Sequence, residues 1–174
     1  MAESLANILQ RMAAEGYDLG RAPPTADEVL ADITTKARNV GSNAPGELAE
    51  MLAQGTAQRV AVEEYRQWLS ALEPSLRDKI LNDWGDPAES PLMTERVGDD
   101  VNLVIPTVQY GNVLLMPQPS RAAGEDLEKL YHAKGLAPTH QYVASYAWLR
   151  NGYQADAVVH VGTHGTLEWL DGRD

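Results

Sequence analysis

Two imidazoles and one carboxylate stand at regular spacing near the end of this chain: His160, His164 and Glu168. A neutral imidazole can bind a divalent metal or transfer a proton near neutral pH, and a neighbouring carboxylate can be a ligand, an orienting partner or a base. The spacing is compatible with a metal site but is weakly specific by itself. The alternative is that His160 is a hydrogen-bonded core histidine and His164 a loop residue.

The elements around these side chains are predicted from the local pattern. Residues 155–161 form a short apolar, β-branched run, typical of a strand that is buried on both faces. Residues 162–165, Gly-Thr-His-Gly, predict a tight loop. If residues 165–170 are helical, His164 and Glu168 share one face. Ligands of open α/β sheets bind where strands end and helices begin, and the predicted site lies at such a place.

The two glycines of that loop also allow a phosphate-binding interpretation, because Gly-x-x-Gly before a helix can present backbone amides to an anion. The pattern lacks the lysine of a Walker A loop and the third glycine of a dinucleotide fingerprint, so ATP binding here is not expected. A Gly-x-Ser-x-Gly motif is absent, and no Ser-His-Asp arrangement stands out.

A further histidine, His140, lies near the start of a helix that is predicted over residues 138–151. The helix dipole there disfavours a charged imidazolium, which favours a neutral ring able to bind a ligand. A surface or capping role is the alternative. Other candidates for ligand contact are Gln118, Arg121, Tyr142, Trp148 and Arg150. Core packing is the simpler interpretation of Trp148.

Residues 1–85 are predicted to be a helical region of about five helices, each with one apolar face. One of them opens with a capping box, in which Thr25 is the cap and Glu28 follows three residues later. The other helices are predicted at 4–15, 45–54, 60–72 and 74–84. No titratable cluster in this region looks catalytic.

Residues 86–100 are rich in proline, glycine and acids and lack periodicity, which indicates a loop or linker. Residues 101–174 are predicted to be an α/β region that carries the His-Gly-Thr-His-Gly-type signature. Its β-type runs at 101–108 and 113–116 favour a hairpin, although Pro106 weakens the first strand and leaves two unpaired segments as the alternative.

The order strand, helix, strand up to residue 161 suggests a parallel crossover. The expected fold class is therefore α/β: a helical N-terminal half followed by a small, partly parallel sheet with flanking helices.

Composition excludes several classes of protein. The net charge of −11 disfavours nucleic-acid binding, and the absence of cysteine excludes disulfides, thiolate metal sites and cysteine nucleophiles. No membrane-length apolar run and no signal-peptide pattern is present, so a soluble, cytoplasmic protein is expected. Most of the negative charge lies in residues 1–100, either as a solvated helical surface or as an acidic face for a basic partner.

Residues 158–170, Val-Val-His-Val-Gly-Thr-His-Gly-Thr-Leu-Glu-Trp-Leu, resemble the signature of the large chelatase subunit family. That family comprises the cobaltochelatase subunit CobN and the corresponding large subunit of magnesium chelatase. The resemblance is strong from about residue 105 to residue 170 and weaker over the helical first half. Its other motifs are Tyr110-Gly111-Asn112-Val113, Pro117-Gln118-Pro119, Pro138-Thr139-His140-Gln141-Tyr142 and Tyr146-Ala147-Trp148-Leu149-Arg150.

This resemblance implies the tetrapyrrole-binding large subunit of an ATP-dependent metal chelatase. The implied reaction is the entry of Co2+ into a corrin-ring precursor of cobalamin, with loss of two pyrrolic protons. Leu167-Glu168-Trp169-Leu170 resembles the cobalt branch more than the magnesium branch, and Mg2+ with a porphyrin is the alternative. Partner subunits of the AAA+ type would hydrolyse the ATP, which is not expected to bind here.

The resemblance also implies roles for single residues. His164 and Glu168 would be catalytic and, with His160, would hold the metal ion. The residues that would bind the macrocycle are His140, Gln118, Arg121 and Arg150, with the arginines pairing with its carboxylates.

Family members are several times longer, so the chain is expected to be a fragment that works with the remainder of the large subunit and is inactive alone. Leu170-Asp171-Gly172-Arg173 stands where the family has Leu-Pro-Gly-Lys, so no role is expected for Arg173. Two other functions stay open: a non-catalytic module that binds a tetrapyrrole or metal or docks onto a partner protein, and a metal-dependent hydrolase that uses His160, His164 and Glu168.

Overall fold

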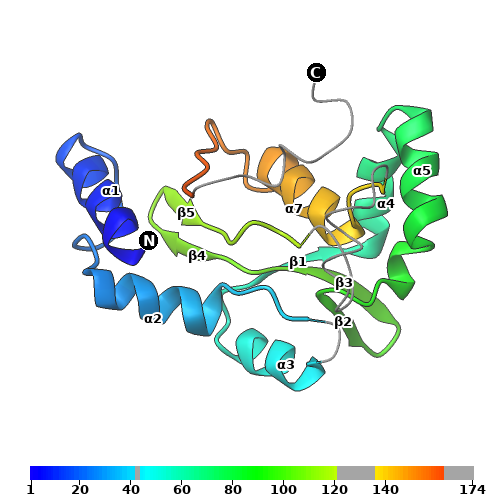
Figure 1. Ribbon diagram of the computed structural model, residues 1–174, viewed down its shortest axis with the longest axis horizontal. Helices are drawn as coiled ribbons and strands as arrows, with labels where there is room; N and C mark the ends of the chain where they lie inside the picture. Colours follow the sequence, from blue (N-terminus) through cyan, green and yellow to red (C-terminus); the bar gives the residue numbers. More distant parts are fainter. Residues whose placement is uncertain (42–43, 121–135, 163–174) are drawn as a thin grey trace.

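The computed structural model describes residues 1–41, 44–120 and 136–162, in which helices surround two small antiparallel sheets (Figure 1). The helices are α1 (Ala2–Ala14), α2 (Ala26–Lys36), α3 (Pro45–Ala53), α4 (Val62–Ser70), α5 (Pro74–Trp84), the short 3-10 helix η1 (Pro87–Glu89) and α7 (His140–Asn151). The strands are β1 (Gln58–Ala61), β2 (Thr94–Val97), β3 (Asp100–Ile105), β4 (Val108–Tyr110) and β5 (Val113–Leu115). The predicted α/β class with a helical N-terminal half is confirmed.

Local chemistry explains where the helices begin. At α2 the predicted capping box is confirmed: Thr25 Oγ1 accepts a hydrogen bond from the Glu28 backbone N–H at 3.3 Å, and the Glu28 carboxylate accepts one from the Thr25 backbone N–H at 2.7 Å. At α5 the Glu73 carboxylate accepts from the Leu76 backbone N–H at 3.1 Å, and Pro74 fills the first helical position.

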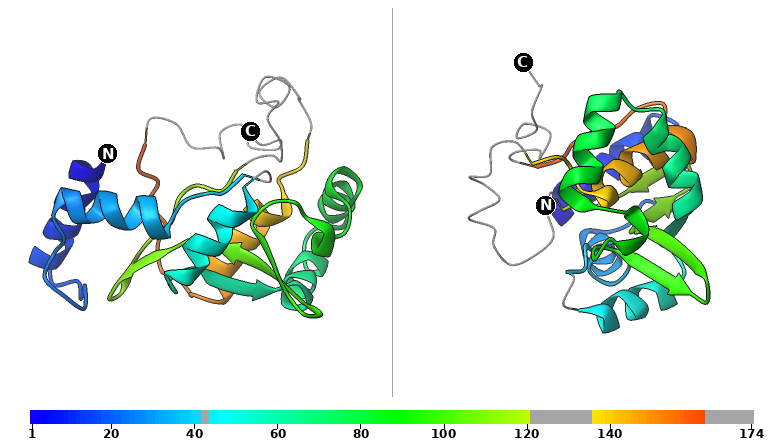
Figure 2. Two further views of the ribbon diagram at one scale, coloured as in Figure 1. Left: turned by 90° about the horizontal axis from the view of Figure 1, so that it is seen from below. Right: turned by 90° about the vertical axis from the view of Figure 1, so that its right-hand side faces the viewer.

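Strand β3 is the centre of the larger sheet, whose order is β1-β3-β2 with both pairings antiparallel. Leu103 and Ile105 point to one face and belong to a core shared with α4, α5 and α7. Val104 points to the other face, where it packs with Met51 of α3. All three β3 side chains are fully buried, so helices cover the sheet on both faces (Figure 2).

A hairpin with Gly111 and Asn112 in its turn is present, but it joins β4 to β5, whereas the first predicted strand, 101–108, pairs mainly with β1 and β2 as β3. The predicted run is divided between β3 and β4, because the chain leaves the larger sheet at Pro106, which has no N–H to donate to a strand ladder. The hairpin packs against α1 and α2 as a second core, and the Tyr110 hydroxyl donates to Asp32 Oδ2 at 2.7 Å.

Three strand predictions need correction. β1 and β2 lie in the regions predicted to be helical and loop, and both pair with β3. Residues 155–161, predicted to be a buried strand, form no strand, and Val158 and Val159 are 52% and 78% exposed. The sheet is therefore not partly parallel in the described residues, because the run that was expected to add the parallel strand pairs with none of them. The division into 1–85, 86–100 and 101–174 stays a prediction.

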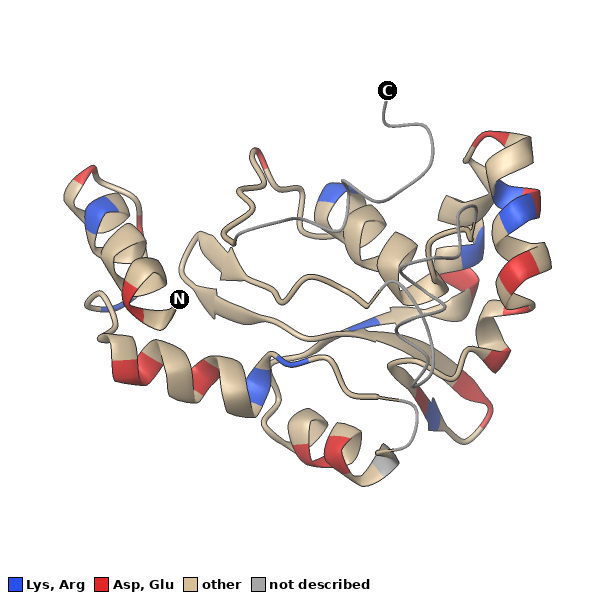
Figure 3. Cartoon of the chain, in the orientation of Figure 1, with Lys and Arg blue, Asp and Glu red and all other residues tan. Residues whose placement is uncertain are grey.

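Charge is distributed unevenly over the elements (Figure 3). Acidic residues outnumber basic ones on α2 and α3, and α5 carries both signs, whereas the only charged residue of α7, histidine aside, is Arg150. Helix α7 therefore offers a nearly neutral surface. Within the part of the chain that the structure describes, no helix has both the length and the apolar character needed to cross a membrane.

Gly111 and Gly98 provide a matched pair of substitutions. Both have positive φ, +52° and +61°, but a Cβ on Gly111 would lie 2.6 Å from the Gly20 backbone nitrogen, whereas a Cβ on Gly98 would meet nothing within 4 Å. Gly98→Ala should therefore cost only the left-handed backbone strain, about 1–2 kcal/mol. Gly111→Ala should cost about 1–3 kcal/mol more through overpacking, measured by urea unfolding. Equal losses would contradict this account of the hairpin contact.

Candidate functional site

His140 begins α7 and points into the core. Its Nε2 lies 3.0 Å from the Gly85 carbonyl oxygen and its Nδ1 lies 3.0 Å from the Tyr65 hydroxyl. A carbonyl can only accept, so Nε2 carries the proton and Nδ1 accepts from Tyr65. The side chain is 1% exposed, and its ring contacts the Tyr65 ring edge-on. Both ring nitrogens thus have partners inside the protein, which is the geometry of a core histidine.

Burial lowers the pKa of the His140 imidazole below its usual 6.5, because the charged form loses hydration; the Gly85 carbonyl and the Asp86 carboxylate oppose this shift. Burial likewise raises the pKa of the Tyr65 phenol. The ring is therefore held neutral, as the sequence predicts, but desolvation rather than the helix dipole is the main cause.

The next residue of α7, Gln141, points away from this pair and joins a chain of amides. Gln141 Nε2 donates to Asn39 Oδ1 at 3.2 Å, and Asn39 Nδ2 donates to the Gln118 backbone oxygen at 2.6 Å. The single Asn39 carboxamide therefore connects α7, the segment after β5 and the segment after α2. This places Gln118, one of the predicted ligand contacts, beside Gln141.

Gln141 Oε1 is buried and has no hydrogen-bond partner among the described residues, whereas the buried Gln118 Nε2 faces the Tyr146 hydroxyl as a donor. Gln141 as a whole is 1% exposed. An unsatisfied buried polar atom costs about 1–3 kcal/mol, so most such atoms in folded proteins bind ordered water or another molecule.

A row of rings lies next to these amides. The Tyr142 and Tyr146 rings are one helical turn apart with centroids at 5.1 Å, and the exposed His160 ring stacks on Tyr146 with centroids at 6.2 Å and planes at 30°. Burial raises the pKa of the Tyr146 phenol, and the Gln118 side chain, acting on the same phenol, opposes the rise. The rings and the amides therefore line one side of α7, where His160 is exposed, Tyr146 is half-buried, and Tyr142 and Gln141 lie below the surface.

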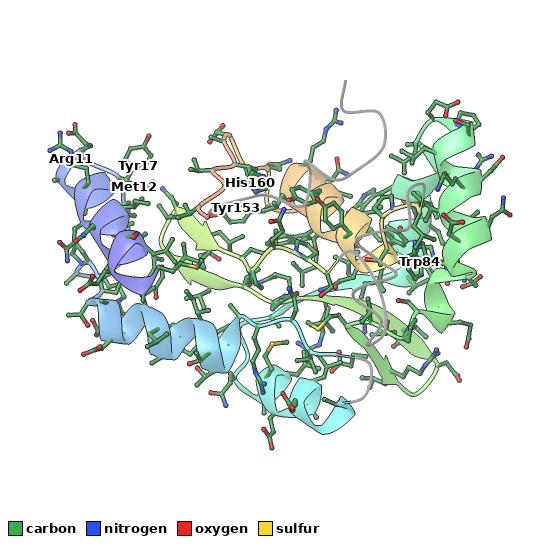
Figure 4. All side chains as sticks on the ribbon, in the orientation of Figure 1. Arg11, Met12, Tyr17, Trp84, Tyr153 and His160 are labelled. Atoms are coloured by element: carbon green, nitrogen blue, oxygen red, sulfur yellow. The ribbon has the colours of Figure 1, made fainter. Side chains whose placement is uncertain are left out.

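The segment that carries His160 is attached to this surface through Tyr153 (Figure 4). The Tyr153 ring stacks on Trp148 with centroids 5.6 Å apart, and its hydroxyl donates to the Asn112 backbone oxygen at 3.1 Å. Trp148 also packs against the main core, as its simpler interpretation predicts. The chain is thus held to α7 and to the hairpin turn before it reaches His160.

Of the other predicted site residues, the structure describes Arg150. Arg150 is exposed near the end of α7 and forms no ion pair with any described residue. Arg121, His164 and Glu168 lie outside the described residues. Within ranges 1–41, 44–120 and 136–162, no three His, Asp or Glu side chains are grouped closely enough to hold a metal ion. The trio of His160, His164 and Glu168 therefore stays a prediction.

Sequence reasoning missed Asn39, Gln141 and Tyr146 as members of this surface. Gln141 and Tyr146 lie inside motifs that carry the family resemblance, which is the signal that could have found them. Asn39 follows the end of α2 and carries no pattern of its own. Only its two hydrogen bonds identify it.

The Tyr65–His140 hydrogen bond can be tested by Tyr65→Phe. This change leaves Nδ1 of a buried imidazole without its donor, and we expect a loss of about 1–3 kcal/mol in the free energy of unfolding. Tyr17→Phe is the control, because Tyr17 is 57% exposed, and it should be close to neutral. Equal stabilities of Tyr65→Phe and the unchanged chain would contradict the bond.

The lowered pKa of His140 also predicts a pH dependence. The unfolded chain binds the histidine proton below about pH 6.5, whereas the folded chain binds it only at lower pH, so stability should fall as the pH drops through this window. His140→Gln should remove this part of the slope. The free energy of unfolding of both chains is measured in urea between about pH 7.5 and 5.5. The difference between the two profiles reports His140 alone, because all other titrating groups are common to both chains. Parallel profiles would show that His140 does not titrate differently on folding.

Comparisons with known proteins agree with this fold. The family model described as CobN/Magnesium Chelatase matches residues 1–174. A solved structure, the catalytic subunit of cobaltochelatase from Mycobacterium tuberculosis, superposes with a TM-score of 0.76 at 35% identity, over 97% of this chain and 14% of that chain.

Two curated relatives come from the two branches of the family, one a cobaltochelatase and one a magnesium chelatase. The aerobic cobaltochelatase subunit CobN of Sinorhizobium sp is 31% identical over 95% of this chain, and the H-type subunit of the Rhodobacter capsulatus magnesium chelatase is 33% identical over 98%. This chain spans only 12% and 13% of their respective lengths. The chain belongs to the CobN/magnesium chelatase family.

Proposed function

We propose that this chain is part of the tetrapyrrole-binding large subunit of an ATP-dependent chelatase, which inserts Co2+ into a corrin-ring precursor of cobalamin. The observation that carries the proposal is the row of rings beside the Gln118 and Gln141 amides, in which Tyr142 is tilted against Tyr146 and His160 stacks on Tyr146. Aromatic faces next to polar groups suit a flat macrocycle with polar substituents. Magnesium and a porphyrin are the alternative, since relatives of both kinds match the chain.

Metal insertion requires ligands for the incoming ion and a base for the two pyrrolic protons. His164 and Glu168 supply these groups in the proposal, and His160, four residues before His164, adds a third ligand. Arg121 and Arg150 pair with carboxylates of the macrocycle. Because both His140 nitrogens are used inside the core, we give that residue a supporting role: it fixes the start of α7 and does not touch the macrocycle.

The proposal includes partners and a place in the cell. AAA+ subunits hydrolyse the ATP, and the remainder of the large subunit completes the site, so the isolated chain should not turn over. The complex acts in the cytoplasm. Turnover by the 174-residue chain alone would contradict this arrangement.

The catalytic roles can be tested in a full-length relative, at the positions that match Glu168 and His164. Glu168→Gln and His164→Ala should each reduce the rate of metal insertion by about 100-fold or more, the contribution typical of a general base, while macrocycle binding persists. Glu64→Gln is the control, because Glu64 is exposed on α4, and it should keep the normal rate. Normal rates in both site variants would disprove the roles.

A non-catalytic binding module is the second candidate, and it rests on the same rings and amides along α7, which suit a flat ligand by themselves. Titration of a corrinoid or a porphyrin, followed by quenching of the tryptophans, measures binding by the chain. A full-length relative with its partners that binds the macrocycle but never inserts metal would favour the module.

A further inference from the structure

The chain leaves α7 through a turn at residues 152–155, which we call the exit turn, and this turn is bonded back to the helix. The Tyr153 backbone N–H donates to the Trp148 carbonyl oxygen at 2.8 Å, and the Ala155 backbone N–H donates to the Leu149 carbonyl oxygen at 2.9 Å. These bonds satisfy carbonyl groups that the end of a helix leaves without a partner. The backbone of the exit turn is therefore tied to α7.

Two positions of the exit turn accept only this arrangement. A Cβ on Gly152 would lie 2.5 Å from Trp148 Cδ1 and 2.7 Å from its Nε1, so a larger residue must displace the indole. That indole is held between the main core and the Tyr153 ring. Gln154 has φ +57°, a left-handed conformation that a residue with a side chain keeps only where its surroundings impose it. The exit turn is thus specified more tightly than an ordinary surface loop.

Tyr153 also joins the exit turn to the hairpin. Its hydroxyl donates to the Asn112 backbone oxygen at 3.1 Å, and the Asn112 backbone N–H donates to the Asp18 carbonyl oxygen at 2.8 Å. The acceptor of the tyrosine is therefore itself held by the connection between α1 and α2. One side chain thus fixes the exit turn against two separate parts of the fold.

His160 lies further along the same segment and depends on this anchor. Its ring stacks on Tyr146, which precedes Trp148 on α7, so the segment runs back along the helix from the exit turn (Figure 4). Val158 and Val159 are 52% and 78% exposed, so the intervening run contributes little packing of its own. The direction in which the exit turn releases the chain therefore decides whether the imidazole reaches its place on the helix.

We propose that Gly152 and Tyr153 are positioning residues for His160: they hold the exit turn so that the imidazole is stacked on Tyr146 before any ligand arrives. This inference rests on the proposed function, in which His160 adjoins the macrocycle and the metal ion. Ordering the segment only at the moment of binding would be subtracted from the affinity. If the imidazole is in place in only a fraction of the chains, the apparent affinity falls by that fraction.

Nuclear magnetic resonance of the free 174-residue chain tests the positioning without any ligand. The unchanged chain should show a nuclear Overhauser contact between the ring protons of His160 and Tyr146, and His160→Gln assigns the signals. The contact should be lost in Gly152→Ala, because the new Cβ displaces the indole on which the exit turn is built. It should be weakened in Tyr153→Phe, which keeps the stacked ring and removes only the hydroxyl.

The core and two exposed positions provide the controls. The edge-on contact between the His140 and Tyr65 rings, with centroids 5.6 Å apart, should persist in every variant and shows that the core is intact. Gly46→Ala and Tyr17→Phe are the matched substitutions, because a Cβ on Gly46 would meet nothing within 4 Å and Tyr17 is 57% exposed. Neither should alter the contact of His160.

Binding of a metal-free porphyrin with two propionate side chains, followed by the absorbance of the porphyrin, measures the consequence. Gly152→Ala should bind it about tenfold more weakly than the unchanged chain, as should His160→Gln. Gly152→Ala should cause no further loss in the His160→Gln background, because the positioned ring is already absent. A merely structural glycine would weaken both backgrounds equally. Tyr153→Phe provides the same comparison with a smaller disturbance of the fold.

The outcomes separate this inference from the proposed function. A contact between His160 and Tyr146 that survives in both Gly152→Ala and Tyr153→Phe overturns the inference, and so do equal losses of affinity in the two backgrounds. Failure of the unchanged chain to bind a porphyrin or a corrinoid overturns the proposed macrocycle site instead. The ring contact in the free chain then still decides whether the exit turn positions His160.

Discussion

The burial of β3 on both faces is the constraint on which the arrangement of this molecule depends. Its two edges are occupied by β1 and β2, and its alternating side chains point into two cores. A strand without free edges or free faces cannot shift its register without exposing Leu103, Val104 or Ile105. Helix α7, which packs on one face of this strand, is therefore held in a fixed position relative to the sheet.

From that position α7 serves two different environments. His140 points toward α4 and α5, where it completes a buried hydrogen-bonded pair with Tyr65. Gln141 points toward Asn39, and Tyr142 and Tyr146 begin the row of rings that ends at His160. Neighbouring residues of one motif thus have different roles. His140 fixes the helix to the core, and Gln141 and Tyr142 contribute to the side of the helix that carries the rings and amides.

Much of the helical half could be predicted from sequence because its signals are local. The Thr25–Glu28 capping box and the proline at the start of α5 act within one turn. Strand pairing depends on distant partners, and there the predictions were weaker: β1 is only four residues long, and β2 lies in a polar stretch. Residues 155–161 have the composition of a buried strand, but pairing and burial are not properties of composition, and here the run is exposed.

The residues of the candidate site were likewise predicted only in part. Gln118 and His160 were predicted as functional residues and lie beside the same ring of Tyr146. His140 was predicted to contact a ligand, but no pattern along the chain reveals that Tyr65 and Gly85 take both of its nitrogens. Asn39 was not predicted at all, because its role exists only through two long-range hydrogen bonds.

The contact at Gly111 has a consequence for how this family can vary. The atoms that a Cβ at this position would meet belong to the backbone of residues 18–20, not to a side chain. A clash with a side chain can be relieved by substituting that side chain with a smaller one. A clash with backbone atoms cannot, because every residue has the same backbone atoms. A larger residue at position 111 should therefore not be rescued by a substitution elsewhere. Only a different path of the backbone between α1 and α2 would make room for it.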